Sequence, residues 1–154
     1  QGAKLDIAKW KRPSPETIPT AAKAAGLYMI CTMSKHAAEA KGCSDALFMD
    51  WEGYVAEATG ANIFFIKDGE VHTPLADRFL NGITRQTVIQ MLKDNGVTVH
   101  ERRIKPEELD GFQECFLTGT AAEVTPVGQI GDWNFQVGPT TRKISDDYEK
   151  LVRA

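Results

Sequence analysis

The sequence predicts an α+β fold, in which a mostly antiparallel and curled sheet, or pseudo-barrel, is flanked by helices. Candidate strands outnumber candidate helices, and most of them pair with the next strand in the chain as a local hairpin. The helices are not spaced as repeated βαβ units, which argues against a parallel sheet. The 154 residues contain no internal repeat or linker, so we expect residues 1–154 to form a single domain.

Apolar periodicity and chain breakers place the elements of the first half. A helix is expected over residues 28–41, with one apolar side formed by Met29, Met33, His36, Ala37 and Ala40, and with Gly42 as its stop. Asp68-Gly69 between two apolar runs is a strong hairpin signal. The expected strands are 4–10, 45–50, 54–56, 62–67 and 70–73.

The second half follows the same rules. An amphipathic helix is expected over residues 84–95, with Val88, Ile89, Met91 and Leu92 on its apolar side and Gly96 as its C-terminal cap. The segments 97–103, 113–118 and 123–130 are expected as strands, and 105–109 as a short helical turn. A terminal helix opens at Gly138-Pro139 and runs towards Val152.

Composition and charge limit the classes of function. With 42% hydrophobic and 25% charged residues, the chain is typical of a soluble globular protein, and it shows no signal peptide and no apolar run of membrane-spanning length. A net charge of -3 argues against nucleic acid or an anionic membrane as the main partner. The basic segment 9–12 (KWKR) beside Pro13 is expected to be a solvated connection.

Cysteine and histidine usage predicts neither a disulfide framework nor a metal site. Cys31, Cys43 and Cys115 are odd in number and widely spaced, as expected of reduced thiols in a cytoplasmic protein. The three histidines (His36, His72 and His100) lack metal-ligand spacing and are interpreted as structural or surface residues.

The segment 53–66 (GYVAEATGANIFFI) contains the first candidate site residue. Two apolar runs surround a lone acid, Glu57, which is followed by four small residues. A carboxylate at the end of a buried strand is costly unless a cation or a hydrogen-bond donor accompanies it. The same pattern also fits a turn acid that faces water.

Two further turns offer backbone N–H groups. Gly82-Ile83-Thr84 opens a helix with Thr84 as a hydroxyl N-cap candidate, and the first turn of such a helix suits a phosphate or a carboxylate. Gly119-Thr120-Ala121-Ala122 is a second turn of small residues with a hydroxyl. Taken singly, each also fits an ordinary cap or turn without a ligand.

A lysine and a phenol complete the candidate set. Lys23 is flanked by Ala and Gly, and a sheltered lysine forms Schiff bases with aldehydes, although a surface lysine has the same local pattern. Tyr28 could supply a phenol near it. A lysine, a phenol, a buried glutamate and two anion-binding turns are the parts of a pyridoxal 5′-phosphate site.

The sequence resembles the large C-terminal domain of the fold type IV pyridoxal phosphate enzymes, and within them the branched-chain amino acid aminotransferases. The resemblance covers nearly the whole chain. Four stretches carry it, in the order and approximate spacing of that family: RPSPETIPTAAKAAGLY, GYVAEATGANIFFIKDG, GITRQTVIQMLKDNGVTV and ECFLTGTAAEVTPV.

The resemblance implies a role for each matching residue. Lys23 would be the Schiff-base lysine and the proton carrier, Tyr28 would bind the cofactor phenolate, and Glu57 would pair with the pyridine nitrogen. The remaining roles are packing on the ring (Leu80), phosphate binding (Ile83, Thr84 and Thr120) and substrate carboxylate binding (Ala121 and Ala122). The implied reaction is transamination between branched-chain L-amino acids and 2-oxoglutarate, by a cytoplasmic homodimer or hexamer.

The chain departs from the family pattern at several points. Leu27 replaces a polar residue between the lysine and the tyrosine, and Asn81 stands where a proline commonly precedes GIT. The small N-terminal domain of the family has no counterpart in these residues, so we expect a fragment with an incomplete active site and little activity. The alternatives are a D-amino acid aminotransferase, an aminodeoxychorismate lyase, and a non-catalytic assembly domain.

Overall fold

The computed structural model describes residues 2–14, 20–77, 81–120 and 122–153, with the side chains of all of these except 20–28. Within this part of the chain, nine strands form one sheet in the order β3-β2-β1-β8-β7-β4-β5-β6, with β9 beside β8. The strands are β1 Ala3–Ile7, β2 Asp45–Met49, β3 Val55–Ala58, β4 Asn62–Lys67, β5 Glu70–Pro74, β6 Val99–Arg102, β7 Glu114–Gly119, β8 Glu123–Ile130 and β9 Trp133–Asn134.

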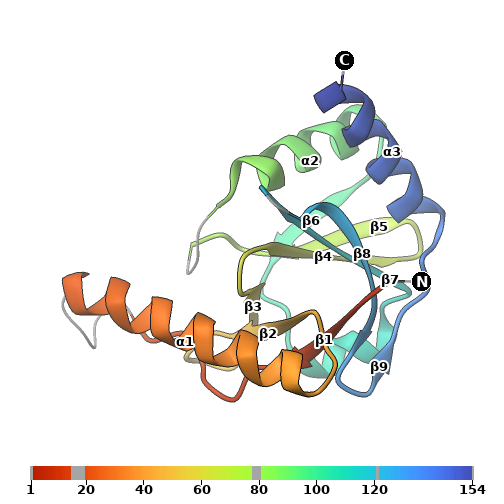
Figure 1. Cartoon of the computed structure of the whole chain (residues 1–154). Helices are drawn as coiled ribbons and strands as arrows, with labels where there is room; N and C mark the ends of the chain where they lie inside the picture. Colours follow the sequence, from red (N-terminus) through yellow and green to blue (C-terminus); the bar gives the residue numbers. More distant parts are fainter. Residues whose placement is uncertain (1, 15–19, 78–80, 121, 154) are drawn as a thin grey trace.

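The sheet curls until its two edges meet (Figure 1). The N–H of Val55, at the start of β3, donates to the carbonyl of Ile104, just beyond β6, at 2.8 Å. Leu47, Ile63 and Leu117, from three separate strands, belong to one buried cluster inside this curl. The expected curled sheet is therefore confirmed.

The position of strand β4 between two buried clusters explains its uninterrupted apolar sequence. Ile63 and Phe65 belong to the inner cluster, whereas Phe64 and Ile66 belong to a second cluster that includes residues of the helices. Successive side chains of a strand point to opposite faces, so both faces of β4 are buried. Phe64 stacks on Phe116 of β7 with ring centroids 4.7 Å apart, which fixes the register of the two strands on the helix-covered face.

The helices lie in two groups (Figure 1). Helix α1 (Thr20–Ala40) packs against β1 and β2, while α2 (Ile83–Asp94) and α3 (Pro139–Arg153) contact each other and β7. A 3₁₀ turn spans Pro106–Gly111. Within the described residues, no helix combines the length and the apolar character that crossing a membrane requires.

The sheet is more mixed than the sequence suggested. Five of its eight strand pairings are antiparallel, but β1–β2, β1–β8 and β5–β6 are parallel. Helices α1 and α2 provide the crossovers for β1–β2 and β5–β6, because a parallel pair needs a long connection. Two βαβ units are therefore present, although the spacing of the helices had not indicated repeated βαβ units.

The expected apolar side of α1 is wrong. The helix begins at Thr20 rather than at residue 28, and Met29 and Met33 are 61% and 45% exposed. Among the described side chains of the helix, 29–40, the buried ones are Ser34 and Ala38, one turn apart, and Ala38 packs on Cys43 and Ala46. Small side chains let the helix approach the sheet closely, so the bulky methionines face outwards.

Two other expectations are confirmed. The turn at Asp68-Gly69 has positive φ at both residues, 52° and 78°, as a two-residue hairpin between β4 and β5 requires. On α2, Val88, Ile89 and Leu92 are buried as expected.

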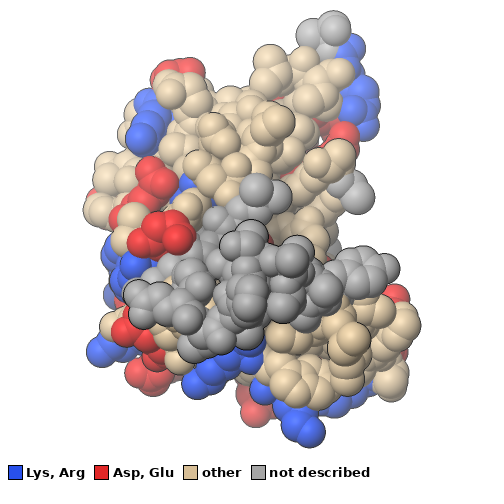
Figure 2. Space-filling model, turned by 90° about the vertical axis from the view of Figure 1, so that its left-hand side faces the viewer, with Lys and Arg blue, Asp and Glu red and all other residues tan. Residues whose placement is uncertain are grey.

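On the face in Figure 2, acidic and basic side chains are interspersed, and the described ones form no broad basic surface.

Candidate active site

Glu57 lies in β3, and its side chain is only 13% exposed. It forms an ion pair with Arg12, whose side chain is 10% exposed. Burial raises the pKa of Glu57 to about 7, although the nearby Arg12 guanidinium favours the anion through its charge and its hydrogen bond. Of the two interpretations of Glu57, the structure supports the buried and paired carboxylate.

Arg12 is a site residue that the sequence analysis missed. The segment 9–12 was expected to be solvated, but Arg12 is buried, and its backbone N–H donates to the carbonyl of Met49 in β2 at 3.0 Å. That expectation is therefore wrong for Arg12. A buried carboxylate requires a cationic partner, which was the available signal, but the sequence does not say which of 18 basic residues supplies it.

The turn that follows Glu57 is held in place by a second carboxylate. Asp45, at the start of β2, accepts hydrogen bonds from the Thr59 hydroxyl and, at 3.2 Å, from the Thr59 N–H. The Ala58 N–H donates to the Ala61 carbonyl at 2.9 Å and closes the turn. The small residues after Glu57 thus form a fixed wall.

Helix α2 begins without a side-chain cap. Its N-cap is Gly82, in extended conformation (φ −63°, ψ 152°), so Thr84 is the second helical residue and not the cap expected from the sequence. The Gly82 N–H donates to the Asn62 side chain at 3.3 Å. At the start of α3, by contrast, the buried Glu114 carboxylate accepts the Thr141 N–H at 2.9 Å. Within the described part of the chain, the first turn of α2 therefore keeps the unpaired N–H groups that bind anions.

These elements enclose a hollow of about 190 Å³. Glu57 and Gly82 lie in its wall together with the turn after β3 and the end of β7; the lining residues are Glu57, Thr59, Gly60, Ala61, Asn62, Gly82, Thr118, Gly119 and Thr120. A Cβ on Gly119 would lie 2.8 Å from the Gly60 carbonyl oxygen, so the two walls meet only because residue 119 is glycine. The Thr118 hydroxyl is buried and lacks a hydrogen-bond partner within the described residues.

A larger hollow, of about 540 Å³, lies where β1 meets β8. Its lining includes Lys4 and Arg142 but no carboxylate, hydroxyl or thiol among the described residues. The smaller hollow is therefore the better candidate for chemistry, because it combines an acid, hydroxyl groups and a helix N-terminus.

The structure brings several expected site residues together. Glu57 and Thr120 line the hollow, and Ile83 and Thr84 follow Gly82 in the first turn of α2. Ala122 is half-buried, and its carbonyl accepts the Thr125 hydroxyl at 2.6 Å. Leu80 and Ala121 lie outside the described residues, as do the side chains of Lys23 and Tyr28.

Helix α1 carries Lys23 and Tyr28 in its first half, and Cys31 of the same helix lies within electrostatic range of Glu57. Burial raises the pKa of the Cys31 thiol, and the negative charge of Glu57 raises that pKa further. Cys31 follows Tyr28 by one helical turn. The segment with the expected lysine and tyrosine is therefore joined to a part of α1 that lies within electrostatic range of the hollow.

Two of the histidines lie side by side in the structure, although the sequence suggested that all three were scattered. His72 and His100 are paired across β5 and β6 with stacked rings 4.6 Å apart, and His100 Nε2 lies 2.8 Å from a Glu70 oxygen. Ligand atoms of these three residues lie within 4.8 Å of one another, as a metal ion would require. However, Arg102 donates to His72 Nδ1 at 3.2 Å, which places a cation against this cluster.

Comparison with known proteins identifies the class to which this fold and site belong. The family described as amino-transferase class IV matches residues 2–130. The chain is therefore a member of the class IV aminotransferase family.

Particular relatives carry a more specific name. The chain is 44% identical to a probable branched-chain-amino-acid aminotransferase of Rickettsia conorii, over 99% of this chain and 54% of the relative. The branched-chain aminotransferase of Thermoproteus uzoniensis, solved with norvaline, has a TM-score of 0.90 and 38% identity over 99% of this chain and 52% of its own. The T.th. branched-chain amino acid aminotransferase, complexed with N-(5′-phosphopyridoxyl)-L-glutamate, also scores 0.90 at 38% identity, over 98% and 52%. The chain thus spans about half the length of the relatives it matches.

Proposed function

We propose that this chain is the cofactor-binding part of a pyridoxal 5′-phosphate-dependent aminotransferase that acts on branched-chain L-amino acids and 2-oxoglutarate. One observation carries the proposal. A single hollow is lined by a largely buried carboxylate, Glu57, by an uncapped helix N-terminus at Gly82 and by the turn of Thr120. A pyridine ring that bears a phosphate requires this combination of groups.

The residues of the hollow fit that cofactor. The ion pair with Arg12 balances the negative charge of Glu57. A carboxylate next to the pyridine nitrogen would keep that nitrogen protonated. The N–H groups of Ile83 and Thr84, with Thr120, would hold the phosphate. The Thr118 hydroxyl, which has no partner among the described residues, and the close approach at Gly119 are features of a wall shaped for a bound group.

The remaining roles follow the family pattern and complete the proposal. When bound, the cofactor withdraws electrons from the α-carbon of an amino acid attached to it. Lys23 would anchor the cofactor and carry the proton between the α-carbon and the ring substituent, and Tyr28 would orient the phenolate. Leu80 would exclude water from one ring face, and the amides of Ala121 and Ala122 would bind the substrate carboxylate.

The substrate, assembly and compartment are also part of the proposal. Branched-chain donors are supported by the names of the relatives, and 2-oxoglutarate by the phosphopyridoxyl-glutamate complex of the T.th. enzyme. We expect a homodimer or hexamer, which light scattering after gel filtration would detect. The three free cysteines favour a reducing compartment such as the cytoplasm.

An amino-donor panel tests the substrate class. The full-length product of the gene that encodes this chain is supplied with pyridoxal phosphate and 2-oxoglutarate, and glutamate formation is measured with leucine, isoleucine, valine and D-alanine. We expect turnover with the three branched-chain donors and none for a Lys23→Ala variant. Turnover restricted to D-alanine would assign the protein to a sister activity, as would pyruvate release in a parallel assay with aminodeoxychorismate. Undiminished turnover in the Lys23→Ala variant would reject the proposed role of Lys23.

A further inference from the structure

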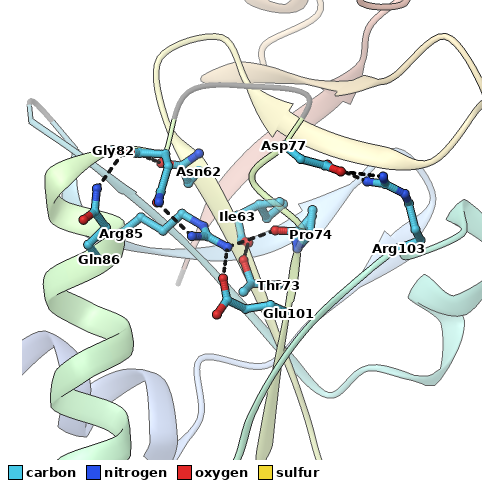
Figure 3. A network of polar contacts seen from close by, with 11 residues as sticks. Asn62, Ile63, Thr73, Pro74, Asp77, Gly82, Arg85, Gln86, Glu101 and Arg103 are labelled. Atoms are coloured by element: carbon cyan, nitrogen blue, oxygen red, sulfur yellow. Dashed lines mark hydrogen bonds and ion pairs between the residues drawn. The ribbon is translucent and has the colours of Figure 1, made fainter.

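Arg85 is a buried cation beside the hollow but not in its lining. It is the third residue of α2, its side chain is 1% exposed, and it is among the largest fully buried side chains of the described residues. Its guanidinium donates to the Asn81 side chain at 2.8 Å. It also donates to the Pro74 carbonyl and the Glu101 carboxylate at 3.0 Å each (Figure 3). Its Nε is buried without an acceptor among the described residues.

These contacts tie the first turn of α2 to two strands. Pro74 is the last residue of β5, Glu101 lies in β6, and Asn81 directly precedes the N-cap Gly82. On the same connection, Arg103 binds Asp77 with two hydrogen bonds of 2.7 Å (Figure 3). Two contacts therefore fix the described parts of the connection between β5 and α2: one to Glu101 of β6, through Arg85, and one to Arg103, just after β6.

The planar guanidinium of Arg85 has the geometry that is needed to tie the first turn of α2 to two strands. Its fixed fork of donors reaches three acceptors in different directions, whereas the ammonium of a lysine carries the same charge at one point. The N–H groups of Ile83 and Thr84 bind an anion well only while α2 begins at Gly82 in the observed orientation. Arg85 acts on that orientation, because its guanidinium binds the residue just before the cap and does not line the hollow.

We propose that Arg85 is a positioning residue of the anion site: through Asn81, Pro74 and Glu101 it holds the uncapped N-terminus of α2 in its anion-binding orientation. The proposal rests on the proposed function, since the anion is the phosphate of pyridoxal phosphate. It assigns a role to Asn81, whose exposed side chain supplies one of the three acceptors.

The test compares how variants of the full-length gene product bind pyridoxal phosphate and pyridoxal, which lacks the phosphate. The variants are Asn81→Ala, Arg85→Lys and the double variant, with Gln90→Ala as the matched control. Gln90 is exposed on the same helix, and its side chain contacts Asp94 at the far end. Binding is followed by absorbance, and folding by circular dichroism, so that Asn81→Ala keeps the test valid if Arg85→Lys does not fold.

We expect Asn81→Ala and Arg85→Lys each to weaken pyridoxal phosphate binding by about tenfold, the equivalent of one charge-assisted hydrogen bond. Pyridoxal binding and the Gln90→Ala control should not change, and the double variant should bind no more weakly than Arg85→Lys, because Asn81 acts through Arg85. Unchanged binding of pyridoxal phosphate by Asn81→Ala, or an equal loss for both ligands, overturns the inference alone. If the unmodified protein binds no pyridoxal phosphate, the proposed function fails, and with it the inference that depends on it.

Discussion

At the scale of the residue, the carboxyl group of Glu57 is subject to two opposing effects. Burial disfavours its charge, whereas Arg12 favours it, and burial dominates, so the pKa rises from 4.5 to about 7 in the cofactor-free protein. A protonated ring nitrogen would add a second cation beside this carboxylate. Cofactor binding should therefore lower the pKa of Glu57 and keep its charge at neutral pH.

The raised pKa predicts how stability depends on pH in the cofactor-free protein. Below pH 4.5, Glu57 is protonated in both the folded and the unfolded chain; between pH 4.5 and about 7, only the folded chain keeps the proton. The contribution of Glu57 to the free energy of unfolding is therefore full at low pH and falls by about 3 kcal/mol as the pH rises through this window. Urea unfolding across the window should show this fall in the unmodified protein relative to Glu57→Gln. Parallel pH curves for the two proteins would contradict the assignment.

The sequence showed that Glu57 required a partner but not which partner it had. The strand-and-turn pattern around Glu57 is local, so it was visible in the chain. The contact with Arg12 joins residues 45 positions apart and depends on β2 and β3 lying side by side. A local sequence pattern does not indicate which distant residue contacts Glu57.

At the scale of the element, the hollow depends on two turns that meet without side chains between them. Gly119 ends β7, and its α-carbon lies against the Gly60 carbonyl in the lining of the hollow. Strands β4 and β7, in register from Asn62–Thr118 onwards, bring these turns together. Position 119 thus requires glycine because the Gly60 carbonyl leaves no room for a Cβ, and not because the backbone there must be flexible.

Paired glycine variants test this close approach. Gly119→Ala places a Cβ 2.8 Å from a backbone oxygen, so the turns must separate, and we expect a loss of about 1–3 kcal/mol in the free energy of unfolding. Gly60→Ala meets nothing within 4 Å and should stay within about 0.5 kcal/mol of the unmodified protein. Thermal and urea unfolding of both variants measure the difference. Equal stabilities would show that the turns do not meet as described.

The helices show which element features a sequence can predict. The apolar stripe of α2 was predictable, because bulky residues at helical spacing are buried in the usual way. The buried side of α1 was not, since Ser34 and Ala38 face the sheet in place of the methionines. The N-cap of α2 was misplaced by two residues, because Gly82 takes the cap position through its backbone and leaves Thr84 inside the helix.

At the scale of the whole molecule, the candidate site is a product of the curled sheet. Its lining comes from β3, the turn after it, β4, the residue before α2 and the end of β7. The sequence predicted most of these strands and the curl, but not the strand order or the parallel pairs, which depend on crossovers between distant segments. The pairing of His72 with His100 was missed for the same reason.

We propose that this hollow binds pyridoxal 5′-phosphate next to Lys23. Its most direct test is the visible absorbance of the full-length gene product with added pyridoxal phosphate, before and after borohydride, followed by peptide mass spectrometry. We expect a visible band that borohydride removes, with the added mass of the reduced cofactor on the peptide that contains Lys23. Absence of the band, or an added mass on a different lysine, would contradict it.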